Sequence, residues 1–105
     1  MLPIQRLKKS NTIDNLWIYV LTLIKEAPKN EPIYAWQIRS AVKKKFGFLP
    51  GEITAYRVLY RLEKDGFVKS QQAEIKRFYK ITDKGIKELD NAVKFYKETL
   101  DLIKG

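Results

Sequence analysis

Residues 52–70 read EITAYRVLYRLEKDGFVKS, and this stretch decides the fold. At about 100° per residue, the rotation of an α-helix, Ala55, Val58, Leu59 and Leu62 fall in one sector. The opposite sector and its flanks hold mostly basic, aromatic and polar side chains, namely Ile53, Thr54, Tyr56, Arg57, Tyr60, Arg61 and Lys64. The stretch therefore predicts a helix over residues 53–65 that packs on one side and stays open on the other.

A basic β-hairpin is predicted directly after this helix, which ends at Asp65-Gly66. Residues 67–70 and 75–82 have the composition of strands, and the polar QQAE at 71–74 predicts the turn between them. Four basic side chains lie on this hairpin: Lys69, Lys76, Arg77 and Lys80.

Two helices are predicted upstream. The first spans about residues 13–26, with Thr12 or Asp14 as its cap, and the second spans about 33–46 and ends at Gly47. The turn PKNEP, residues 28–32, lies between them. In the first helix, eight of the nine residues in LWIYVLTLI (16–24) are apolar. Such a helix should be covered on nearly every side, and we expect a second copy of the chain to help cover it.

The last predicted helix begins after Thr82 and runs to about Lys104. Its apolar residues recur at spacings of 3 and 4, as in a coiled-coil seam. We therefore expect a homodimer whose interface holds Leu16, Val20, Ile86, Leu89, Val93, Tyr96, Leu100 and Ile103. The alternative is a single chain whose last helix folds back over its own first helix.

Charge divides the chain into parts. Residues 82–105 contain five acids and five lysines, so the whole net charge of +9 lies in residues 1–81. Residues 1–12, with Pro3, three bases and no acid, predict a basic mobile arm, or else simply a frayed terminus. The expected organisation is an arm over 1–12, a compact domain over 13–81 and a dimerisation helix over 82–105.

Composition excludes several classes of function. The chain has no cysteine and no histidine, so disulfides, the usual zinc ligands and the commonest general base are missing. We therefore expect neither an enzyme nor a cofactor. The longest apolar run has nine residues, against the roughly 20 needed to span a bilayer. We expect a soluble, cytoplasmic protein without a membrane partner.

Three helices, a hairpin and a final helix are the order of a winged helix-turn-helix, a mostly α fold with a small β-hairpin. Its recognition helix and wing would then meet double-stranded DNA through Thr54, Tyr56, Arg57, Tyr60, Arg61, Lys64, Lys69, Lys76 and Arg77. Each basic residue alone is equally well explained as a solvated surface charge. Two other functions stay open, a winged-helix protein-interaction module and a sequence-tolerant architectural DNA-binding protein.

The motifs Leu49-Pro50-Gly51, Thr54-Ala55-Tyr56 and 59–66 (LYRLEKDG) resemble the recognition helix of PadR-like transcriptional regulators. RFYKITDKG, residues 77–85, resembles that family's wing strand and the start of its dimerisation helix. The resemblance covers roughly residues 14–104, with Ile33 and Arg57 at positions where the family usually has glycine and proline. It implies a homodimeric, repressor-like protein on a palindromic operator, and some members respond to small molecules.

Two tryptophans allow a further interpretation. Trp17 and Trp36 would suit an effector pocket at the centre of a dimer, because aromatic side chains line sites for flat ligands. Ordinary packing explains both residues as well, so a small-molecule effector is possible but unsupported by the sequence.

Overall fold

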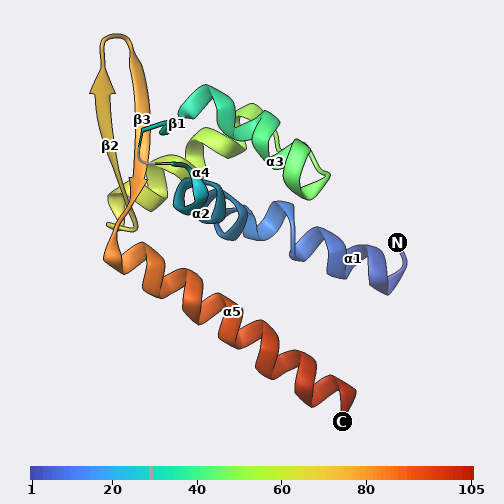
Figure 1. Ribbon diagram of the computed structural model, residues 1–105. Coiled ribbons are helices and arrows are strands. Elements are labelled where there is room, and N and C mark those ends of the chain that lie inside the picture. The colour runs from blue at the N-terminus through green and yellow to red at the C-terminus, as the bar shows by residue number, and fades with distance from the viewer. Residues whose placement is uncertain (29) are drawn as a thin grey trace.

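The computed structural model describes residues 1–28 and 30–105 and has the expected architecture of helices with a small antiparallel sheet (Figure 1). In chain order the elements are α1 (Pro3–Ser10), a 3-10 turn (Ile13–Asn15), α2 (Leu16–Glu26), β1 (Ile33–Tyr34), a second 3-10 turn (Ala35–Gln37), α3 (Ile38–Phe46), α4 (Glu52–Lys64), β2 (Val68–Ala73), β3 (Lys76–Ile81) and α5 (Asp83–Lys104). The predicted fold class, a winged helix-turn-helix with a C-terminal helix, is confirmed. The hairpin stands at one edge of the helical body, and α5 runs away from that body (Figure 1).

The centre of the molecule is α2, which packs against α3, α4, α5 and β3 of its own chain. Every residue from 16 to 24 is buried or half-buried as a result. Leu16 and Val20, predicted at a dimer interface, are 1% and 0% exposed and already belong to the core of the single chain. Leu89, which is 6% exposed, also belongs to this core rather than to a free seam. One chain covers its apolar helix because the first turns of α5 fold over it.

A compact helix-turn-helix joins α3 to α4. Gly47 ends α3 in the left-handed region, at φ 85°, where a residue without a Cβ is favoured. The Arg39 Nε atom then donates to the Pro50 carbonyl at 2.9 Å and ties α3 to the loop that precedes α4. Pro50 itself is buried, so this turn is held from both sides.

The sheet contains a strand that sequence patterns missed. The second helix was predicted from residue 33, but Ile33 and Tyr34 form β1 and pair with Tyr79 and Phe78 of β3. The wing turn is also shorter than the predicted 71–74, because β2 stays paired up to Ala73 opposite Lys76. Only Glu74 and Ile75 turn the chain, with Glu74 at φ 58°. Part of the predicted turn over 28–32, residue 29, lies outside the described residues.

Within the predicted basic arm over 1–12, residues 3–10 form the helix α1. Gln5 accepts a hydrogen bond from the Leu2 amide at 2.8 Å at the start of this helix. At its end, the Tyr19 hydroxyl donates to the Asn11 carbonyl and holds the segment to α2. The Thr12 hydroxyl donates back to Lys8 at 2.7 Å, so neither Thr12 nor Asp14 caps α2 as predicted. All eight residues of α1 are exposed.

The start of α5 is locked to the junction between α4 and β2. The Thr82 hydroxyl accepts from the Gly85 amide at 3.0 Å and lies 2.7 Å from the Gly66 carbonyl, to which it donates. A Cβ at Gly85 would lie 2.1 Å from the Phe67 carbonyl oxygen, so only glycine permits this approach. The direction in which α5 leaves the body is therefore fixed by backbone contact.

Candidate nucleic-acid interface

The two faces of α4 separate as the sequence predicts. Ala55, Leu59 and Leu62 are at most 5% exposed and face the core. The other side of the helix is open to solvent, and its exposed residues are Ile53, Tyr56, Arg57, Tyr60, Arg61 and Lys64. Thr54 is half-buried at the flank. This open side, residues 53, 54, 56, 57, 60, 61 and 64, is called the α4 face below.

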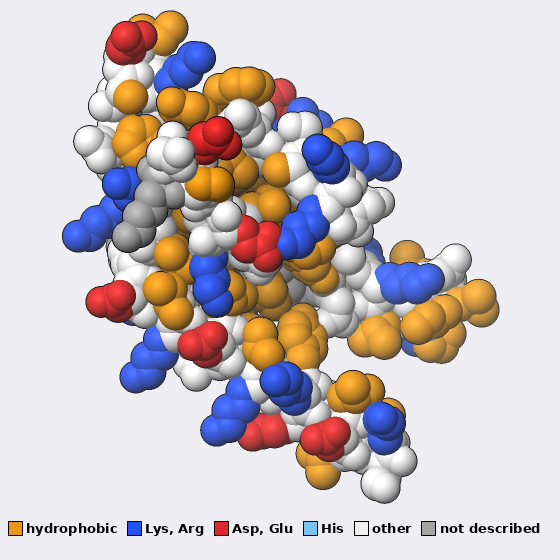
Figure 2. Space-filling model, in the orientation of Figure 1, with side chains coloured by type: hydrophobic (Ala, Val, Ile, Leu, Met, Phe, Trp, Pro, Cys, Tyr) orange, Lys and Arg blue, Asp and Glu red, His pale blue; other side chains and the backbone are white. Residues whose placement is uncertain are grey.

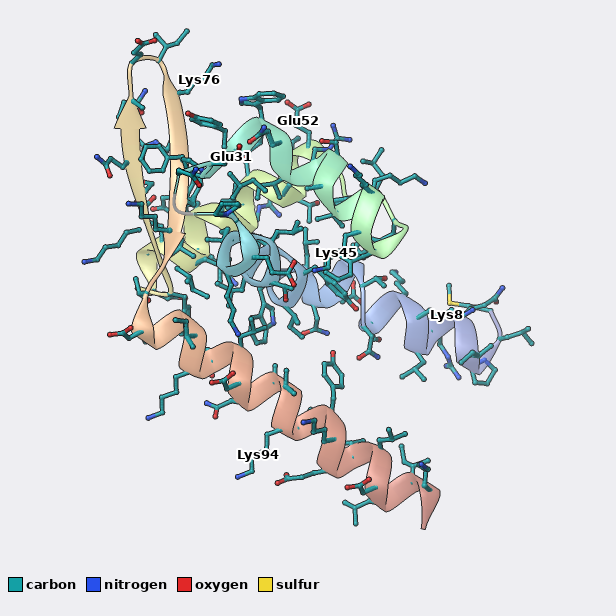
Figure 3. The ribbon with its side chains drawn as sticks, in the orientation of Figure 1. Lys8, Glu31, Lys45, Glu52, Lys76 and Lys94 are labelled. Carbon is teal, nitrogen blue, oxygen red and sulfur yellow. The ribbon has the colours of Figure 1, made fainter. Side chains whose placement is uncertain are left out.

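The wing carries the second part of the basic surface. Val68 and Tyr79 point inward and are buried, whereas Lys69, Lys76, Arg77 and Lys80 are exposed. The Lys76 ammonium lies 5.7 Å from the centre of the Tyr34 ring, a cation–π distance. In Figure 3, Lys76 and the first residue of α4, Glu52, lie toward one end of the molecule, and Lys94 of α5 lies toward the other. The wing and the start of α4 thus face away from the projecting end of α5.

Glu63 joins the wing to α4, and sequence reasoning missed it. Its carboxylate accepts from the Ser70 amide at 3.2 Å and also from the Ser70 hydroxyl. Arg77 donates to that hydroxyl at 2.8 Å and lies 3.9 Å from the same carboxylate. Arg77, predicted as a free DNA contact, is therefore partly engaged within the protein. The signal in the sequence was an acid on an otherwise basic helix end, seven residues before a serine.

The same carboxylate affects a neighbouring phenol. Burial raises the pKa of the Tyr79 hydroxyl above its usual value, and the nearby negative charge of Glu63 raises this pKa further. Tyr79 therefore stays neutral under β3 at physiological pH.

Lys43, Lys44 and Lys45 occupy the last turn of α3, where positive charge also suits the helix dipole. Lys45 forms an ion pair with Glu26 of α2. The helix dipole and this ion pair give these lysines a structural role in α3.

The two tryptophans, predicted to line an effector pocket at the centre of a dimer, lie beside two different hollows of the single chain. Trp17 is half-buried beside a groove between α2 and α5, lined also by Asn15, Glu88, Asn91, Phe95 and Tyr96. Trp36 is 61% exposed and borders a different hollow, beside Gln37 and Lys44 of the α3 region. Trp17 lies in the first turn of α2, whereas Trp36 lies in the 3-10 turn before α3.

Residues 1–28 and 30–105 hold neither a candidate metal site nor a candidate membrane span. No cluster of three or more acidic, histidine or cysteine side chains in this part of the chain is arranged to hold a metal ion. None of the helices described combines the length and apolar character needed to cross a bilayer.

Fold and exposed basic helix define a winged helix-turn-helix protein. The model of the transcriptional regulator PadR-like family matches residues 20–91, which run from α2 into the first half of α5. The chain belongs to this family, whose members are transcriptional regulators and not enzymes. No curated protein matches the sequence significantly.

Solved structures agree with this fold. A transcriptional regulator from Clostridium thermocellum is similar with a TM-score of 0.74 and 22% identity, over 99% of this chain and 96% of the other. F93 from STIV, a winged-helix DNA-binding protein, is similar with a TM-score of 0.65 and 21% identity, over 80% of this chain and 88% of the other. Bacillus subtilis PadR in complex with operator DNA is similar with a TM-score of 0.60 and 22% identity, over 74% of this chain and 46% of that one.

The contact of Glu63 with the wing predicts a local effect on hydrogen exchange. In Glu63→Ala, the Ser70 amide loses its charged acceptor on the free edge of β2, and such a bond contributes about 1.5 kcal/mol. We expect this amide to exchange about tenfold faster in NMR or mass-spectrometric measurements, while the amide of Leu59 keeps its protection. Glu52→Ala, which removes an acid from the other end of α4, is the control. Unchanged exchange at Ser70 would show that Glu63 does not hold the wing.

Proposed function

We propose that this chain is a homodimeric, repressor-like regulator in the cytoplasm that binds double-stranded DNA sequence-specifically. The recognition helix α4 enters the major groove, and the wing over residues 67–81 lies on the flanking backbone or minor groove. One observation carries this proposal: Arg57, Tyr60 and Arg61 are exposed on the α4 face while the back of the same helix is buried.

The chemistry of the α4 face suits a DNA groove. Arg57 and Arg61 carry planar guanidinium groups that can donate two hydrogen bonds to guanine or phosphate. Lys64 supplies a point charge, and the Thr54 and Tyr56 hydroxyls can donate to phosphate near the helix N-terminus. Tyr60 adds a large ring that is 66% exposed.

The wing would supply contacts that position the helix. Lys69 and Lys76 extend from an exposed strand surface toward solvent and suit phosphate. Arg77 is held near Glu63, so it would meet DNA only by exchanging that partner for a phosphate. The wing then contributes affinity rather than sequence information.

A second copy of the chain is the expected partner of α1 and the outer half of α5. Hydrophobic side chains gather on the projecting ends of both helices (Figure 2). These exposed residues are Leu2, Ile4, Leu7, Val93, Phe95, Tyr96, Leu100, Leu102 and Ile103. An apolar surface of this kind on a small protein marks an interaction site. A twofold dimer would place two copies of α4 about 34 Å apart, one turn of DNA.

Removing the guanidinium groups tests DNA binding. Against a duplex selected from a random pool, we expect Arg57→Ala/Arg61→Ala to bind at least about 100-fold more weakly, because each bidentate contact contributes about 1–3 kcal/mol. The control is Lys87→Ala/Lys94→Ala, which removes the same charge from exposed sites on α5. Gel shifts at two salt concentrations are the measurement, and binding should weaken as salt rises.

Three results would contradict the proposal in different ways. Equal binding by both double variants would remove the α4 face as the contact surface. Equal competition by random duplexes would favour a sequence-tolerant architectural protein. Failure to bind any duplex would favour a protein-interaction module.

Light scattering tests the dimer. The wild type should have twice the chain mass, whereas Leu100→Asp/Ile103→Asp should have the mass of one chain, since two buried carboxylates would oppose association. The control Lys94→Asp places an acid on the opposite side of α5, where the side chain is 73% exposed. A single-chain mass for the wild type, or a dimer in all three proteins, would rule out this interface.

A further inference from the structure

Ile53 is the most exposed large hydrophobic residue of α4, with 74% of its surface open. It lies in the first turn of the helix, one residue after Glu52 and one turn before Arg57. The core of the protein is built without it, from Ala55, Leu59 and Leu62 of the same helix. A β-branched apolar residue at this exposed position therefore adds nothing to the packing of the fold.

Ile53 belongs to α4, whereas the surface expected to bind a second copy of the chain is on α1 and the outer half of α5. Several exposed apolar residues belong to α5, and in Figure 3 Glu52 lies toward one end of the molecule whereas Lys94 of α5 lies toward the other. Neither Ile53 nor the carboxylate of Glu52 suits a phosphate, because one is apolar and the other negative. Of the first turn of α4, Glu52 and Ile53 are thus better matched to base edges than to the DNA backbone, whereas Thr54 can donate to phosphate.

We propose that Ile53 reads the C5-methyl group of thymine in the major groove. Residues in the first turn of a recognition helix contact base edges, and thymine is the base that presents a methyl group there. Arg57 lies one helical turn further on the same face and meets guanine or phosphate next to this contact. Each half-site then contains a thymine opposite the start of α4. This inference rests on the proposed function and names a base that the α4 face selects.

Deoxyuridine provides the test, because it pairs like thymine but lacks the methyl group. In the duplex selected from the random pool, each thymine is replaced by deoxyuridine in turn and the dissociation constant is measured. For the wild type, we expect one position in each half-site at which the change weakens binding about fourfold, the effect of burying one such carbon group. Ile53→Ala should bind the thymine and deoxyuridine duplexes equally at that position.

Ile13→Ala is the matched control, since Ile13 is another exposed isoleucine and lies in the 3-10 turn before α2, outside both the α4 face and the wing. This variant should keep the wild-type response to deoxyuridine, and thermal unfolding should show that both variants are folded. The inference is overturned if no deoxyuridine position weakens the wild type, or if the weakening persists in Ile53→Ala. Specific binding without any thymine effect leaves the proposed function intact, whereas failure of all duplexes to bind overturns both.

Discussion

The packing of one side of α4 onto α2 is the constraint on which the rest of the structure depends. Ala55, Leu59 and Leu62 are buried, and the helical repeat then leaves Arg57 and Arg61 on the outside. Glu63 at the end of α4 accepts a hydrogen bond from the Ser70 amide of β2. The packing of α4 therefore also positions the wing relative to the body. A core contact thus determines which charges the protein presents and at what angle the hairpin stands beside them.

Charge and packing both set the outer part of α5 apart from the rest of the chain. Residues 1–81 hold the whole excess positive charge, and residues 82–105 are neutral. The first turns of α5 belong to the core through Leu89, whereas the outer turns leave Leu100 and Ile103 uncovered. A helix that is anchored at Gly85 and apolar at its far end can join two copies without reaching the basic surface.

Local patterns predicted much of this structure, and contacts between distant segments account for the misses. The helical period identified the buried and open sides of α4, and the spacing of apolar residues identified α5, from sequence alone. The two-residue strand β1 exists only because β3 pairs with it, and no local signal shows that partner. Leu16 and Val20 were assigned to a dimer, but contacts of α2 with α3, α4, α5 and β3 bury them within one chain, as the stated alternative of a last helix folding back over the first partly anticipates. Glu63 was missed for the same reason, since its partner Ser70 lies across the turn into the wing.

Nuclear magnetic resonance of the arginine side chains tests the central claim most directly, because it observes the α4 face itself during binding. On titration with the selected duplex, the Nε–H signals of Arg57 and Arg61 should shift. The signal of Arg39 should stay in place, because its Nε atom donates to the Pro50 carbonyl inside the protein. Unmoved signals from Arg57 and Arg61 in a protein that binds the duplex, with shifts in α5 instead, would contradict the account.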